Sequence, residues 1–69
     1  MALTRRQREV LDVIRQFIED HGYSPSLEEI GSRLGLSSVA TVHKHVSHLV
    51  TKGLVRRVWN QNRSIELQP

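Results

Sequence analysis

Residues 40–48 bring together side chains that could bind a metal ion or form hydrogen bonds with nucleic acid: Thr41, His43, Lys44, His45 and His48. Metal binding is disfavoured, because residues two positions apart on a helix point about 200° away from each other. Only His45 and His48 could share an ion, and no neighbouring carboxylate or thiolate completes a tetrahedral set. We therefore expect no metal ion and no other cofactor.

The same segment has the hydrophobic spacing of an amphipathic helix over residues 39–52. At 100° per residue one arc is apolar, and we expect it to join the core: Val39, Val42, Val46, Leu49 and Val50. The outer arc is small, polar and basic, with His43 and His45 on its flanks: Ala40, Thr41, Lys44, Ser47, His48 and Thr51. A solvated helix face ordinarily mixes charges of both signs, so the lack of any carboxylate here favours nucleic-acid binding.

In a helix-turn-helix, the N-terminal part of the second helix reads base edges in the major groove. The predicted base-reading residues are therefore Ala40, Thr41, His43 and Lys44. Lys44 can donate to guanine O6 or N7, Thr41 can donate to a base or contact a thymine methyl, and Ala40 permits close approach. We expect contacts to the DNA backbone or the adjacent minor groove from a second set: Ser26, Ser38, Ser47, His48, Lys52, Arg56, Arg57 and Arg63. For Trp59, packing within the wing is the favoured role.

Two capping boxes, Thr4 with Gln7 and Ser26 with Glu29, predict helix starts. With the hydrophobic spacing they indicate helices at about residues 4–21, 27–34 and 39–52. β-branched and aromatic residues around an Asn-rich turn predict a two-stranded wing at about 54–67. The predicted fold is mainly α with a small β-hairpin, a three-helix winged helix-turn-helix that forms a single domain over residues 1–69.

Charge is distributed unevenly along the chain. Residues 1–34 carry five basic and six acidic side chains, whereas residues 35–69 carry five basic and one acidic, so the halves of −1 and +4 give the net +3. This basic second half favours a nucleic-acid partner. There is no cysteine, no apolar run long enough for a membrane span, and no spacing of nucleophile and base that indicates an enzyme. We expect a cytoplasmic protein that is not catalytic in these 69 residues and does not bind membranes.

Several motifs in order resemble the N-terminal DNA-binding domain of LexA, a family of bacterial SOS repressors. These are residues 3–7 (LTRRQ), 22–26 (GYSPS), 29–31 (EIG), 38–45 (SVATVHKH) and 52–57 (KGLVRR), and together they span nearly the whole chain. Thr41, Val42, His43 and His45 resemble the branch of the family that reads GAAC-type half-sites. Lys44 stands where that branch carries a small residue.

The resemblance implies a winged helix-turn-helix that represses DNA-damage-response genes at a palindromic, double-stranded operator. It also implies a homodimer in the full-length context, with the isolated domain monomeric or weakly dimeric. In full-length relatives a C-terminal domain carries a self-cleaving Ser-Lys dyad and responds to the recombinase filament on damaged DNA. That domain is absent from these 69 residues.

Two other interpretations stay open at the level of sequence. The chain could be a winged-helix protein-interaction module, or the DNA-binding domain of a phage or plasmid repressor unrelated to the SOS response. Salt dependence separates the first from DNA binding, because counterion release gives a steep slope that an apolar docking surface lacks. The preferred operator sequence separates the second.

Overall fold

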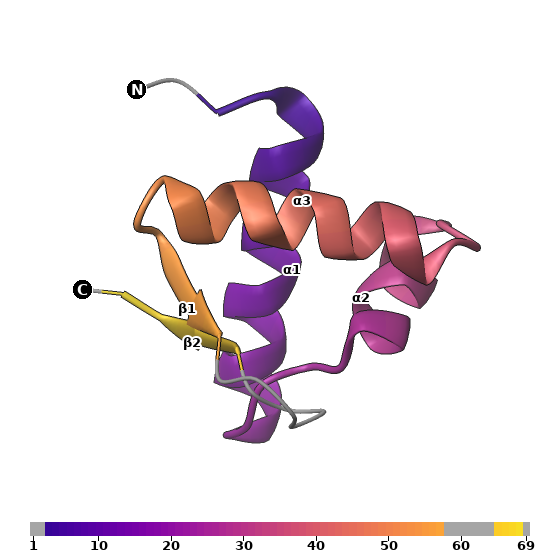
Figure 1. Cartoon of the computed structure of the whole chain (residues 1–69). Helices are drawn as coiled ribbons and strands as arrows, with labels where there is room; N and C mark the ends of the chain where they lie inside the picture. The colour runs from indigo at the N-terminus through magenta and orange to yellow at the C-terminus, as the bar shows by residue number, and fades with distance from the viewer. Residues whose placement is uncertain (1–2, 58–64, 69) are drawn as a thin grey trace.

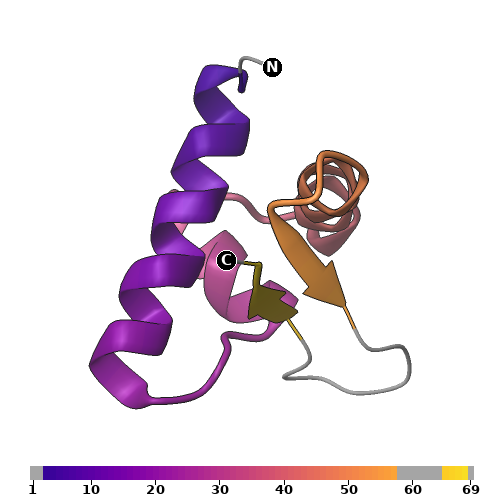
Figure 2. The same ribbon diagram turned by 90° about the vertical axis from the view of Figure 1, so that its left-hand side faces the viewer.

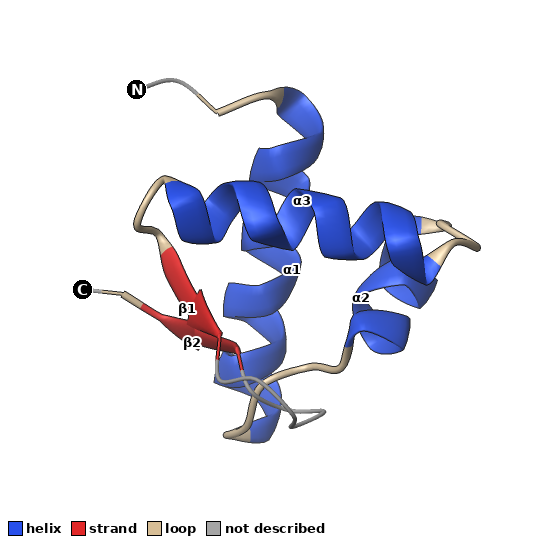
Figure 3. Ribbon diagram, in the orientation of Figure 1, coloured by secondary structure: helices blue, strands red, loops and turns tan. Residues whose placement is uncertain are grey.

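Three helices and a two-stranded hairpin make up the residues that the computed structural model describes, 3–57 and 65–68. The helices are α1 (Arg5–His21), α2 (Leu27–Leu34) and α3 (Val39–Thr51), and the strands are β1 (Val55–Arg57) and β2 (Ile65–Leu67). In Figure 1, α3 crosses in front of α1, with α2 near its N-terminal end and the hairpin near its C-terminal end. The predicted fold class, mainly α with a small hairpin (Figure 3), is confirmed.

Helix α1 begins at the predicted capping box. The Thr4 hydroxyl accepts from the Gln7 backbone N–H at 3.1 Å, and the Thr4 N–H donates to Gln7 Oε1 at 3.3 Å. The helix buries one face in the core and ends at Gly22, whose φ of 79° lies in the left-handed region that favours glycine. The other expected capping box, between Ser26 and Glu29, is also present and starts α2.

The helix-turn-helix depends on close approach between α2 and the residues that follow it. The Leu36 N–H donates to the Gly31 carbonyl at 2.8 Å, which turns the chain toward α3. A Cβ added to Gly31 would lie 3.0 Å from the Leu36 carbonyl oxygen and 3.2 Å from Val42 Cγ2. Glycine at this position therefore lets α2 pack tightly against the turn and α3.

The hairpin packs on the helices through alternate residues. Its strands are antiparallel, with Val55 opposite Leu67, Arg56 opposite Glu66 and Arg57 opposite Ile65. Val55 and Ile65 are buried and belong to the same core as α1 and α3. Figure 2 views α3 nearly end-on and shows β1 leading away from its C-terminal end.

One part of the predicted core is wrong. Val42, Val46 and Leu49 are fully buried as expected, but Val39 and Val50 remain 40% and 39% exposed. Helical spacing gives the direction in which each side chain points, whereas burial depends on how far the neighbouring elements extend. The buried arc of α3 is therefore narrower than the apolar arc of its sequence. The predicted last residue of this helix, Lys52, is its C-cap.

Candidate nucleic-acid interface

The N-terminal turns of α3 present the predicted base-reading residues on its outward surface. Ser38 caps the helix, with its Oγ accepting from the Thr41 N–H at 3.4 Å. Ala40, Thr41 and Lys44 are exposed, and His43 is half-buried. The helix thus offers a methyl group, a hydroxyl and an ammonium group within its first two turns, all within reach of a ligand in front of it. Figure 1 shows this helix at the front of the molecule, without another described element covering it.

The titratable side chains of α3 are all basic. The sequence of α3, VATVHKHVSHLVT, contains no Asp or Glu. The ion pairs of Glu9 are made with Arg5 and Arg6, on the first turns of α1. A polyanion can therefore approach the outward face of α3 without meeting a carboxylate on that helix.

A shallow hollow lies between α3 and the hairpin, and it brings together residues that the sequence predicts as separate contacts. Its lining consists of Val46, Ser47, Val50, Thr51 and Arg57. Ser47 and Arg57, both predicted to contact the DNA backbone, thus border the same depression. Val50 and Thr51 were not predicted as site residues. The position of Thr51 on the outer arc of the helix could have indicated its place in this hollow, whereas nothing in the sequence indicated that of Val50.

Two predicted backbone-contact residues near the C-terminal end of α3 are held by a residue of α1. Gln7 is 7% exposed, and its Nε2 lies 3.0 Å from His48 Nδ1. Its Oε1 accepts a hydrogen bond from Lys52 Nζ at 2.8 Å. The sequence pattern places Gln7 only in the capping box, because no local pattern indicates a partner more than 40 positions away.

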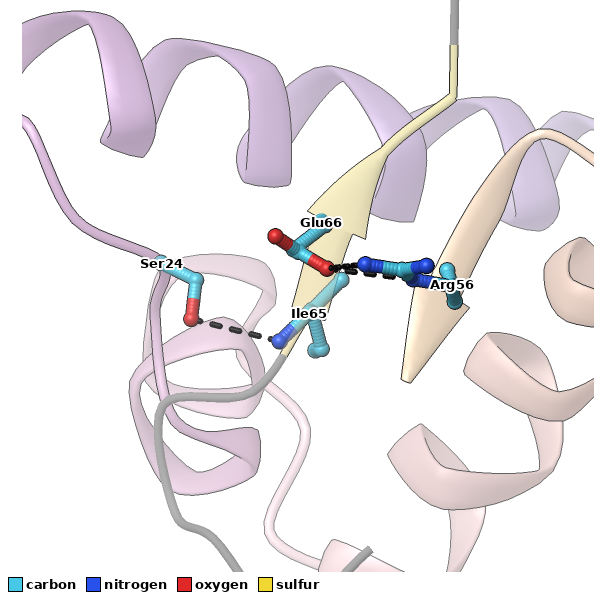
Figure 4. A network of polar contacts seen from close by, with 4 residues as sticks. All are labelled: Ser24, Arg56, Ile65 and Glu66. Atoms are coloured by element: carbon cyan, nitrogen blue, oxygen red, sulfur yellow. Dashed lines mark hydrogen bonds and ion pairs between the residues drawn. The ribbon is translucent and has the colours of Figure 1, made fainter. Parts of the chain in front are cut away.

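The remaining predicted backbone contacts have different surroundings. Arg56 donates from Nε to Glu66 Oε1 at 3.1 Å across the hairpin, with a second bond from its Nη2 (Figure 4). This ion pair places a carboxylate beside the exposed Arg56 guanidinium group. Ser26 is half-buried and its Oγ accepts from the Glu29 N–H at 3.2 Å. Arg63 and Trp59 lie outside the described residues.

Ser24 positions the second strand of the wing. The residue is 8% exposed, and its Oγ accepts from the Ile65 N–H at 3.3 Å, which joins the connector between α1 and α2 to β2 (Figure 4). The same strand presents Glu66 to Arg56. The wing is therefore anchored to the helices by a polar contact as well as by its apolar face.

His45 differs from the other histidines of α3. Its Nδ1 is buried and has no hydrogen-bond partner among the residues that the structure describes. Burial lowers the pKa of His45 below 6.5, and repulsion from Arg6, His48 and Lys44 adds to the effect. Within residues 3–57 and 65–68, no three His, Asp or Glu side chains are grouped to hold a metal ion. The helices in these ranges are all too short or too polar to span a membrane.

Comparison with known proteins agrees with the resemblance found in the sequence. The family described as "LexA DNA binding domain" matches residues 1–64. A LexA repressor of Koribacter versatilis (strain Ellin345) is 58% identical over 67 residues, 97% of this chain and 32% of that protein. LexA repressors of Bacillus mycoides (strain KBAB4) and Bacillus thuringiensis (strain Al Hakam) are each 46% identical over 65 residues, 94% of this chain and 32% of theirs. The chain thus spans about a third of the length of these relatives.

Proposed function

The chain belongs to the LexA DNA-binding domain family, and from this membership we propose that it is the operator-binding domain of a transcriptional repressor of DNA-damage-response genes. The observation that carries the proposal is the outward face of α3. It is exposed at Ala40, Thr41 and Lys44, and the helix has no carboxylate. A face of this kind suits the major groove, whose base edges and flanking phosphates require donors and small side chains.

Base reading is proposed for four residues of α3. Lys44 donates to a guanine, Thr41 donates to a base or contacts a thymine methyl, and Ala40 allows the helix to approach closely. His43 adds a donor or an acceptor at the flank of the helix. All four lie in the N-terminal part of α3, which is the part that enters the groove in helix-turn-helix proteins.

Phosphate contacts are proposed on both sides of α3. His48 and Lys52 lie on the α1 side, and Ser47 and Arg57 lie on the wing side. Ser26 and Ser38 add helix N-termini that can meet a phosphate. Arg63 is proposed to contact the backbone or the minor groove, and Arg56 to contribute less because Glu66 pairs with it.

The whole protein is proposed to act as a homodimer on an inverted repeat. Residues 1–69 are proposed to form a single winged domain, so that two copies would place α3 in successive major grooves about one helical turn apart. Occupation of the promoter blocks polymerase. We further propose a cytoplasmic protein whose C-terminal part dimerises and cleaves itself when the recombinase filament forms on damaged DNA.

Selection from a random-sequence duplex library at two salt concentrations tests the proposal. The domain should retain duplexes with GAAC-like halves in inverted repeat, and its affinity should fall steeply with salt because phosphate contacts release counterions. Binding that is absent or insensitive to salt would exclude the DNA-binding function and favour a protein-docking module. Retention of an unrelated operator would exclude the SOS assignment while leaving DNA binding intact.

Substitution of Lys44 separates base reading from backbone contact. Lys44→Ala should reduce discrimination at one base position by about 1–3 kcal/mol. Arg63→Ala is the matched control, which should weaken all sequences alike and flatten the salt slope by about one unit. A uniform loss from Lys44→Ala would remove Lys44 from the base-reading set.

A further inference from the structure

Gln7 connects the first turn of α1 to the last turns of α3. The side-chain amide of Gln7 is buried, and its Nε2 lies 3.0 Å from His48 Nδ1. Its Oε1 accepts hydrogen bonds from Lys52 Nζ at 2.8 Å and from the Thr4 N–H at 3.3 Å. The Gln7 side chain thus accepts a hydrogen bond from the backbone at the start of α1 and also contacts two residues that lie 41 and 45 positions later in the sequence. Both of these residues belong to the proposed phosphate contacts.

The partners of Gln7 fix the direction of each hydrogen bond. The Thr4 N–H and the Lys52 ammonium group can only donate, so the atom between them must be the carbonyl oxygen of the amide. The Gln7 amide nitrogen, which also can only donate, then faces the His48 ring. His48 Nδ1 must therefore accept, and the neutral ring carries its proton on Nε2.

The reversed amide is excluded by the same partners. Turning the Gln7 side chain by 180° would place its NH2 group against two donors and would remove the oxygen that accepts from both of them. A buried amide that loses its partners costs stability. The network therefore has one consistent arrangement, in which the exposed His48 ring carries an N–H donor on its edge away from Gln7.

We propose that Gln7 is a positioning residue for DNA binding, which holds His48 with its Nδ1 as an acceptor and its Nε2–H as an outward donor, and Lys52 beside it, so that both engage the phosphate backbone. This inference rests on the proposed function. Gln7 itself touches neither bases nor phosphates. Its contribution is to order two side chains before DNA arrives, which removes part of the entropy cost of fixing them on binding.

The variant Gln7→Met tests the inference, with Gln16→Met as its matched control. Gln16 lies on the same helix and bonds Asp20 at 3.0 Å on an exposed surface. On the duplex enriched by selection, Gln7→Met should lose about three- to tenfold in affinity. Its salt slope should flatten by up to about one unit as the Lys52 contact weakens. The order of base preference should not change, and Gln16→Met should behave as the unaltered domain.

A double-mutant cycle separates positioning from loss of the capping box. Gln7 also completes the first turn of α1, so its replacement can lower stability without any role in binding. In a domain that already carries His48→Ala and Lys52→Ala, Gln7→Met should cause no further loss of affinity. A merely structural role would lower affinity by the same factor in both backgrounds, and that result would overturn the inference.

The tautomer of His48 provides a readout that needs no DNA. A long-range ¹⁵N–¹H spectrum of the imidazole rings, recorded at a pH well above the ordinary imidazole range, should show the His48 proton on Nε2. In Gln7→Met the two tautomers should mix. A proton on Nδ1 in the unaltered domain would overturn the inference.

The DNA-binding results distinguish failure of this inference from failure of the proposed function. An unchanged salt slope in Gln7→Met would overturn the inference and leave the proposed function intact. If the unaltered domain does not bind DNA, the proposed function fails as well.

Discussion

Two valines one turn apart on α3 test how this helix faces the core. Val46 is fully buried and Val50 is 39% exposed, although both lie on the apolar arc of the sequence. Val46→Ala and Val50→Ala remove the same two methyl groups and bring the same gain in helix propensity. A difference between the two variants therefore measures burial.

The burial of each side chain sets the expected loss of stability. Removing two buried methyl groups at Val46 costs about 1.6 kcal/mol of transfer free energy, to which the cavity left behind adds. Alanine recovers about 0.5 kcal/mol through its higher helix propensity. We expect a net loss of about 2 kcal/mol for Val46→Ala. Val50 keeps part of its surface in water and leaves no cavity, so we expect a loss of about 0.5 kcal/mol for Val50→Ala.

Urea unfolding followed by far-ultraviolet circular dichroism measures both losses. With a slope of about 1 kcal/mol per molar, the midpoint should fall by about 2 M for Val46→Ala and by about 0.5 M for Val50→Ala. Equal shifts, or a larger shift at Val50, would refute the orientation of α3 and with it the outward face proposed to bind DNA. A change of slope in one variant alone would show that the two unfolding reactions are not comparable.

Three further predictions address local features of the fold. Burial lowers the pKa of His45, so the unfolded chain takes up this proton more readily and the stability that neutral His45 contributes should be lost as the pH falls below about 6.5. Unfolding free energies measured between pH 7 and 5 should decline less in His45→Gln, and parallel declines would contradict this assignment. Ser26→Ala removes the acceptor of the Glu29 N–H and should lower the free energy of unfolding by about 1 kcal/mol, whereas Ser26→Thr keeps a hydroxyl and should lower it much less. Chemical denaturation measures both losses, and equal losses would argue against the cap. Gly31→Val should cost about 1–3 kcal/mol because its Cβ meets the Leu36 carbonyl oxygen at 3.0 Å and its two further methyl groups need additional room beside the turn. Thermal unfolding should show a much smaller loss for Gly31→Ala, whose gain in helix propensity of about 1 kcal/mol offsets the contact, and a harmless valine would refute the tight packing.

The sequence by itself determined the features that depend on neighbouring residues. The capping boxes at Thr4 and Ser26 span three positions, and the helices follow from contacts three and four positions apart. The outward position of Ala40, Thr41 and Lys44 follows from the same periodicity. Their roles in reading bases stay predictions, because base contacts depend on a DNA partner.

The tertiary structure decided which side chains the neighbouring elements cover and which distant partners they meet. Val39 and Val50 share the apolar arc with Val46, yet they stay partly exposed. The role of Gln7 in the capping box could be predicted from the sequence, but its hydrogen bonds to His48 and Lys52 exist only because α1 and α3 cross. Helical periodicity gives a direction for each side chain, whereas coverage and pairing across more than 40 residues arise only when the whole chain has packed.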